Sequence, residues 1–202
     1  VVGVYSAEAR MKAGPGVNHG WHKLGTTTNS ALDLFTVPAG AYSFRKLKST
    51  YSGSAMRLRR ASDNAEQDIG FVGFVPGLGS PFDVAAANTF CAATSCFVRT
   101  WYDQSGNARN AVQATAASQP ALVFNCQGTL PCMRSTGATP RFNTASFTPA
   151  AVSSLSAVAK RPTGIGNCPA ISTDTSNILY LDGTTPRWVL FATSALVVAS
   201  VY

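Results

Sequence analysis

The most constraining feature of this 202-residue chain is a series of short apolar segments separated by turn-forming residues. In 55–60, Met56 and Leu58 alternate with Arg57 and Arg59, which is the period of a half-buried strand. A turn at 182–186 joins two later segments into an expected hairpin. Repeated short strands predict an all-β fold, an antiparallel β-sandwich. The other expected strands are 68–75, 97–102, 121–125, 153–159, 178–181, 187–191 and 196–202.

Two short helices are expected beside the strands. The first covers 41–51 and ends at Gly53, because apolar and aromatic residues recur there at helical spacing. The second begins with Ser80 as its cap and Pro81 at its first position. Residues 1–40 are expected to form an arm, and 41–202 the sandwich. Because the chain stops within an apolar segment, we expect an incomplete sheet whose edge another chain completes in an oligomer or larger assembly.

The composition and charge limit the class of protein. Hydrophobic residues make up 46% and charged residues 12%, which excludes a disordered chain or a coiled coil. The net charge is +7. A basic cluster in 45–60 is typical either of a phosphate, nucleic-acid or acidic-glycan site or of a solvated helix face followed by a strand edge. The second interpretation is preferred, because no aromatic platform accompanies the cluster. Its members are Arg45, Lys46, Lys48, Arg57, Arg59 and Arg60.

Five cysteines indicate an oxidising compartment. Neighbouring cysteines have no metal-ligand spacing, so neither a metal nor a cofactor is expected. Two local disulfides with Cys168 left over are the simplest arrangement, although other pairings stay open. The protein is therefore expected outside the cell or on a virion surface. The two expected pairs are Cys91 with Cys96, and Cys126 with Cys132.

One long stretch carries a family resemblance. The pair Cys91 and Cys96 is followed by a strand and by the turn Tyr102-Asp103-Gln104-Ser105-Gly106, while 51–53 reads Tyr-Ser-Gly and 60–63 reads Arg-Ala-Ser-Asp. Over roughly 40–125 the chain resembles the catalytic domain of α-L-arabinofuranosidase B. Related segments resemble lectin/glucanase domains of bacteriophage tail and surface proteins. The resemblance implies a concanavalin-like β-sandwich of jelly-roll type.

The acids needed for hydrolysis are not found where the resemblance implies them. Glycoside hydrolysis uses two carboxyl groups that flank the sugar. In the family both lie far downstream of the matched turn, whereas here only Asp174 and Asp182 follow it. The family's adjacent cysteine pair is also absent. Asp103 and Asp182 are weak catalytic candidates, because each is explained better as a residue that stabilises its own turn.

Carbohydrate binding requires less than catalysis, namely aromatic rings with amides and carboxylates beside them. One neighbourhood supplies these groups, although Trp101 and Tyr102 point to opposite faces of their strand and only one of them can join a surface site. A second, weaker set is Tyr180, Arg187 and Trp188. The members of the first set are Trp101, Tyr102, Asp103, Gln104, Asn107 and Asn110.

The preferred hypothesis is a non-catalytic, lectin-like or structural module of an extracellular or virion assembly, such as a phage appendage. Its partners would be a glycan and other protein chains. The alternative is a retaining α-L-arabinofuranosidase, or a fragment of one. A nucleic-acid or phosphate binder that uses 45–60 ranks lowest.

Overall fold

The computed structural model describes residues 30–33, 38–73, 79–135, 142–146, 168–172, 178–181 and 188–191. The chain divides into two compact units, Val1–Phe147 and Thr148–Tyr202. The expected strands 153–159 and 196–202 lie outside the described residues, as do residues 1–29 of the expected arm. Asp182 and Arg187 also lie outside them, so their suggested roles stay predictions.

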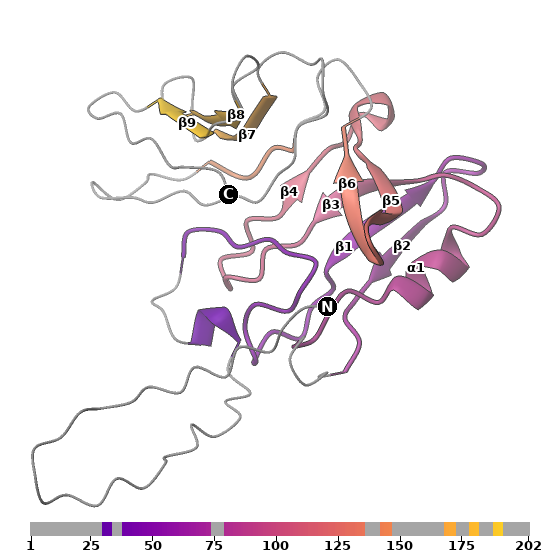
Figure 1. Ribbon diagram of the computed structural model, residues 1–202, viewed down its shortest axis with the longest axis horizontal. Helices are drawn as coiled ribbons and strands as arrows, with labels where there is room; N and C mark the ends of the chain where they lie inside the picture. The colour runs from indigo at the N-terminus through magenta and orange to yellow at the C-terminus, as the bar shows by residue number, and fades with distance from the viewer. Residues whose placement is uncertain are drawn as a thin grey trace, which may run out of the picture. The chain divides into compact units, whose positions relative to one another are not determined.

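The first unit is built on an antiparallel sheet with the strand order β2-β1-β3-β5-β6, in which β4 also pairs with β3 (Figure 1). The all-β fold expected from the sequence is confirmed. Strand β2 begins before the expected 68–75 and ends at Ile69, next to Gly70. The strands are β1 (Met56–Arg60), β2 (Glu66–Ile69), β3 (Cys96–Trp101), β4 (Ala111–Val112), β5 (Ala121–Gln127) and β6 (Leu130–Arg134).

The second unit contains a three-stranded antiparallel sheet, β7 (Cys168–Ser172), β8 (Ile178–Leu181) and β9 (Trp188–Phe191). Strands β8 and β9 pair with Tyr180 opposite Val189, which confirms the expected hairpin. Strand β7 was not predicted, since Pro169 within it argues against a strand by sequence rules.

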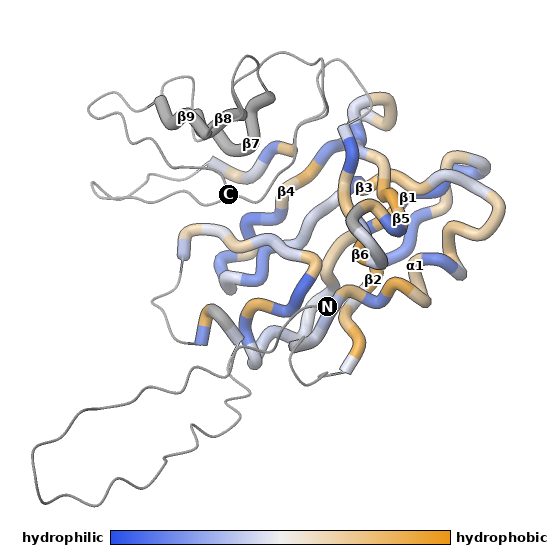
Figure 2. The backbone as a smooth tube through the Cα atoms, in the orientation of Figure 1, coloured by the Kyte–Doolittle hydropathy of each residue, from blue (hydrophilic) through white to orange (hydrophobic). Residues whose placement is uncertain are grey.

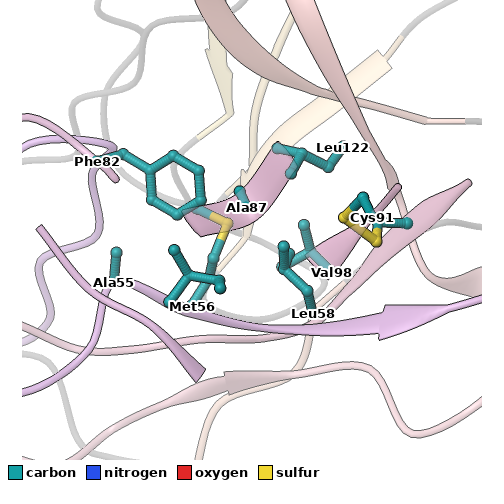
Figure 3. Close-up of a cluster of buried hydrophobic side chains, with 10 residues drawn as sticks. Ala55, Met56, Leu58, Phe82, Ala87, Cys91, Val98 and Leu122 are labelled. Carbon is teal, nitrogen blue, oxygen red and sulfur yellow. A yellow bond between two sulfur atoms is a disulfide. The ribbon is translucent and has the colours of Figure 1, made fainter. Parts of the chain in front are cut away.

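The core of the first unit lies on one face of its sheet (Figure 3). Met56 and Leu58 are fully buried while Arg57 and Arg59 are partly exposed, as the alternation predicts. Hydrophobic and hydrophilic residues are interspersed along the strands (Figure 2). Each fully buried large side chain contributes about 1.5–3 kcal/mol to folding. The cluster also includes Ala55, Ile69, Phe82, Ala87, Cys91, Cys96, Val98 and Leu122.

A short helix, α1 (Val84–Phe90), follows 79–83, and its buried Ala87 joins the core. The expected cap Ser80 is wrong, because Asp83 Oδ1 accepts from the Ala86 amide at 2.9 Å. Pro81 and Phe82 instead form isolated β-bridges with Arg45 and Phe71. Two 3-10 turns, η1 (Ala31–Asp33) and η2 (Ala116–Ser118), complete the helical elements of the described residues.

The helix expected over 41–51 is wrong. No helix forms there: Arg45 bridges Pro81, and a turn follows in which the amide of Tyr51 donates to the carbonyl of Lys48 at 3.1 Å. The amide of Lys46 donates to the carbonyl of Ser80 at 2.8 Å. The amide of Phe82 donates to the carbonyl of Phe44 at 2.7 Å. These long-range backbone bonds override the local helical pattern, as tertiary contacts commonly do.

Both expected disulfides are present, Cys91–Cys96 after α1 and Cys126–Cys132 across strands β5 and β6. Strand β6 at 130–134 was not among the expected strands. Gln127 pairs with Leu130, and Gly128 between them has φ 62°. A positive φ at the first residue of a two-residue hairpin turn suits glycine.

Candidate functional site

The turn after β3 is held by the buried carboxylate of Asp103, which is only 4% exposed. Oδ1 accepts from the amides of Ala41 and Ser105, both at 2.9 Å. Oδ2 accepts from the hydroxyl of Ser105 at 2.7 Å and the amide of Arg109 at 3.0 Å. A carboxylate has about four lone-pair sites, so Asp103 is fully occupied as a structural acceptor.

The next residue of the turn, Gln104, is completely buried. Its Oε1 accepts from the amide of Leu47 at 2.7 Å. Its Nε2 donates to the carbonyls of Ser43 and Arg45, at 3.2 and 3.0 Å. The side chain of Gln104 therefore gives segment 43–47 the kind of hydrogen-bond partners that the backbone of a neighbouring strand would otherwise supply.

Two asparagines complete this arrangement. Nδ2 of the exposed Asn107 donates to the carbonyl of Pro38 at 2.9 Å and to the hydroxyl of Ser105 at 3.0 Å. Asn110 Oδ1 accepts from the amide of Asp103 at 3.1 Å. The structure thus brings together the amides and carboxylate proposed for carbohydrate binding. Most of their polar atoms bind the protein itself, because they fasten 38–47 to the end of β3.

The two aromatic residues of the same set have separate surroundings. The Trp101 ring packs near Tyr42, Phe44 and Phe142, with centroid distances of 5.7, 6.1 and 6.4 Å. Its indole nitrogen is buried without a hydrogen-bond partner among the described residues. The Tyr102 hydroxyl donates to Asp68 at 2.8 Å. Burial, and then the bond to Asp68, raises the pKa of Tyr102 to about 12, so the phenol stays neutral at physiological pH.

A surface hollow of about 550 Å³ lies elsewhere on the first unit. It is formed by three segments, 46–54, 70–73 and the chain at Ser80. Sequence reasoning missed it, because these segments meet only through long-range pairing. The Tyr51-Ser52-Gly53 signature was the one available sign. The lining residues are Lys46, Tyr51, Ser52, Gly53, Ser54, Gly70, Phe71, Val72, Gly73 and Ser80.

The aromatic wall of this hollow is fixed in position. Tyr51 meets Phe71 edge to face at a centroid distance of 6.3 Å. The Tyr51 hydroxyl donates to the carbonyl of Ser54 at 2.8 Å. A Cβ at Gly53 would lie 2.5 Å from the Tyr51 hydroxyl oxygen, so the ring occupies space that only glycine leaves free. Burial raises the pKa of Tyr51, with the charge of Asp103 a smaller cause.

The basic residues of 45–60 differ in their hydrogen-bond and ion-pair partners. Arg57 binds Asp68 through two bonds of 2.7 Å, and Arg60 forms an ion pair with Asp63. Arg59 donates to the side chains of Gln119 and Asn64, at 2.7 and 2.8 Å. These three arginines belong to β1, whereas Arg45 and Lys46 lie in the non-helical segment that replaces the expected helix, and Lys48 begins the turn that follows it. Only Lys46 lines the hollow.

Every carboxylate in the described part of the chain has a structural partner. Glu66 forms an ion pair with Arg99, and Asp33 accepts from the amide of Ser30 at 2.8 Å. Within these ranges no group of three metal-ligating side chains gathers. Of the helices seen there, none has the length and hydropathy needed to cross a bilayer. The carboxylates are those of Asp33, Asp63, Glu66, Asp68, Asp83 and Asp103.

The fold of the chain has a counterpart among solved structures. A structure of a mutant GH54 α-L-arabinofuranosidase soaked with 4-nitrophenyl α-L-arabinofuranoside is similar, with a TM-score of 0.50 and 19% identity. The similarity covers 79% of this chain and 40% of that one, and it concerns the fold.

The sequence comparison points to the same family. Residues 36–129 match the family model for the catalytic domain of α-L-arabinofuranosidase B, so the resemblance is confirmed. The α-L-arabinofuranosidases B of Aspergillus niger and Aspergillus kawachii are each 39% identical over 70 residues. The match covers 35% of this chain and only 13% of each relative.

Proposed function

We propose that this protein acts on arabinofuranosyl-bearing polysaccharide as an α-L-arabinofuranosidase-type protein. The observation that supports this most is the family match over 36–129, which contains the buried turn of Asp103 and Gln104. In this proposal the described carboxylates of the first unit stabilise its fold and do not act as catalytic acids, since they are occupied by backbone and arginine donors.

The expected chemistry is a retaining double displacement by two carboxyl groups about 5–5.5 Å apart. One group attacks the anomeric carbon while the other protonates the leaving oxygen and later activates water. The acids of this chain that lie outside the described residues are Glu8, Asp174 and Asp182. They are therefore the first residues to test.

The test is release of 4-nitrophenol from 4-nitrophenyl α-L-arabinofuranoside, together with binding to arabinan in an affinity gel. We expect release above the buffer rate, and its loss in at least one of Glu8→Gln, Asp174→Asn and Asp182→Asn. Asp63→Asn is the matched control, because that exposed carboxylate pairs with Arg60. Absence of both release and arabinan binding would overturn the proposal.

The second candidate is a non-catalytic, lectin-like module. It is favoured by the structural occupation of all six described carboxylates. If the protein binds arabinan but releases no 4-nitrophenol from the arabinofuranoside, the lectin-like module is supported over the hydrolase. The two disulfides favour an extracellular setting for either function. The phage or virion setting and the assembly with other chains stay predictions, to be tested by the oligomeric state in solution.

A further inference from the structure

The hollow beside Tyr51 carries a positive charge from Lys46. Among the described residues of its lining, Lys46 and Tyr51 are the ionisable ones, and none of these residues is a carboxylate. Within the described ranges Lys46 has no ion-pair partner, in contrast to Arg57, Arg60 and Arg99. Lys46 is a partly buried residue of the lining, and a lysine without an ion-pair partner among the described residues favours an anionic ligand.

The rest of the lining has the chemistry of a sugar site. The lining contains the aromatic residues Tyr51 and Phe71, whose rings meet edge to face, and three serines that offer hydroxyl groups. Small polar groups beside an aromatic surface orient a saccharide, whose ring has an apolar face and a hydroxyl edge. A phosphate is a poorer fit, because phosphate sites usually gather arginine forks or several backbone amides.

We propose that this hollow is a subsite for a uronate, an acidic sugar residue of the polysaccharide, and that Lys46 pairs with its carboxylate. The inference rests on the proposed function for the class of ligand, a polysaccharide. It adds that the polymer carries acidic residues near its arabinofuranosyl groups. One ammonium matches one carboxylate, while the aromatic wall packs against the sugar ring.

The position of Lys46 is set before any ligand binds. Its own amide donates to the carbonyl of Ser80 at 2.8 Å, and Gln104 binds the backbone of the residues on either side of it. A fixed backbone lowers the entropic cost of binding, because only the side chain has to be ordered.

Two glycines of the lining provide a way to fill the hollow without disturbing the fold. A Cβ added at Gly70 or Gly73 would meet no atom within 4 Å, and neither residue has a positive φ. Packing therefore does not require glycine at these positions. A larger side chain at Gly70 would project into free space and occupy the volume that the sugar needs.

The experiment measures binding of a galacturonate tetrasaccharide and of its carboxyl-reduced, neutral form by calorimetry, using the full chain. We expect the acidic form to bind at least about tenfold more tightly, as one charge-assisted contact implies. Lys46→Met should abolish that difference, and Gly70→Leu should weaken both ligands. The matched controls are Lys48→Met, a neighbouring cation outside the lining, and Ala92→Leu at an exposed position.

Equal binding of the two tetrasaccharides, no binding of either, or the same loss with Lys48→Met as with Lys46→Met would overturn the inference. Thermal melts of every variant check that the chain is folded. The arabinofuranoside assay separates the two proposals. Uronate binding without arabinofuranoside release or arabinan binding would defeat the proposed function alone, whereas release without uronate binding would defeat the hollow alone.

Discussion

Gln104 holds the backbone on both sides of Lys46, through a 2.7 Å bond from the amide of Leu47 and a 3.0 Å bond to the carbonyl of Arg45. A residue of the family signature turn thus fixes one wall of a hollow that it does not line. The turn and the hollow are structurally connected, because segment 43–47 binds Gln104 of the turn and contributes Lys46 to the lining of the hollow.

Replacing Gln104 by leucine should therefore affect both stability and binding. The substitution removes the Gln104 partners of partly buried backbone groups of 43–47, and a buried group left without a partner costs about 1–3 kcal/mol. We expect the free energy of unfolding to fall by about 2–4 kcal/mol, measured by urea denaturation. In protein that remains folded, uronate affinity should also fall. Unchanged affinity would show that Gln104 does not position Lys46.

The Asp103 carboxylate is expected to matter more for stability than any exposed acid. In Asp103→Asn an amide group replaces one of two oxygens that together accept four bonds, so a donor faces other donors. We expect a loss of about 3 kcal/mol in the free energy of unfolding. Asp63→Asn, which changes an exposed turn carboxylate, should cost less than about 1 kcal/mol. Similar losses in the two variants would contradict the structural role of Asp103.

Much of the first unit's fold was predictable, because its information is local. The alternation of Met56 and Leu58 with two arginines identified β1 and its buried face. The spacing of the cysteines predicted both disulfides as the simplest of several pairings, and the structure contains both. Asp103 and the residues beside it were recognisable as a turn, since carboxylates and amides commonly bind nearby backbone groups.

The helix expected over 41–51 failed for a physical reason. Phe44 and Leu47 have helical spacing, but Gln104 and the chain at 80–82 offer this segment backbone partners from far away in sequence. The local spacing of apolar residues cannot predict such long-range partners. The hollow was missed for the same reason, because its walls come from three segments that meet only after folding.

Gly53 provides a test of the aromatic wall. A methyl group at this position would lie 2.7 Å from Cζ of Tyr51, so the ring has to move in Gly53→Ala. The movement breaks the bond from Tyr51 to Ser54 and its contact with Phe71. We expect a loss of about 1 kcal/mol in the free energy of unfolding and weaker binding of both tetrasaccharides. Gly70→Ala, where there is room, should leave stability nearly unchanged; equal losses would contradict this account.

The two disulfides should differ in their contribution to stability. They close loops of similar length, with sequence separations of 5 and 6, so the entropic contribution of each is about 2 kcal/mol. Cys91 and Cys96 are also buried in the core, at 7% and 3% exposure. The Cys91→Ala/Cys96→Ala variant should therefore melt several degrees below Cys126→Ala/Cys132→Ala. The reverse order in thermal melts would contradict the placement of the first bridge in the core.

The ion pair between Arg57 and Asp68 predicts a pH dependence of stability. The hydrogen bonds from Arg57, with a further one from Tyr102, lower the pKa of Asp68 below its ordinary value of 3.8. A carboxyl whose pKa is lower in the folded state stabilises the fold fully above the unfolded-state pKa. That contribution is lost as the pH falls through the folded-state value.

Asp68→Asn removes this titration. The pair is more than a third exposed, so its contribution near pH 7 should be only about 0.5–1 kcal/mol. We expect wild type to be the more stable protein at pH 7, and the difference from Asp68→Asn to disappear as the pH falls below 3.8. Urea denaturation at a series of pH values measures this difference directly. Other acids contribute equally to the pH dependence of both proteins. Parallel plots of unfolding free energy against pH for wild type and Asp68→Asn would therefore mean that the ion pair between Arg57 and Asp68 adds nothing to the stability of the sheet.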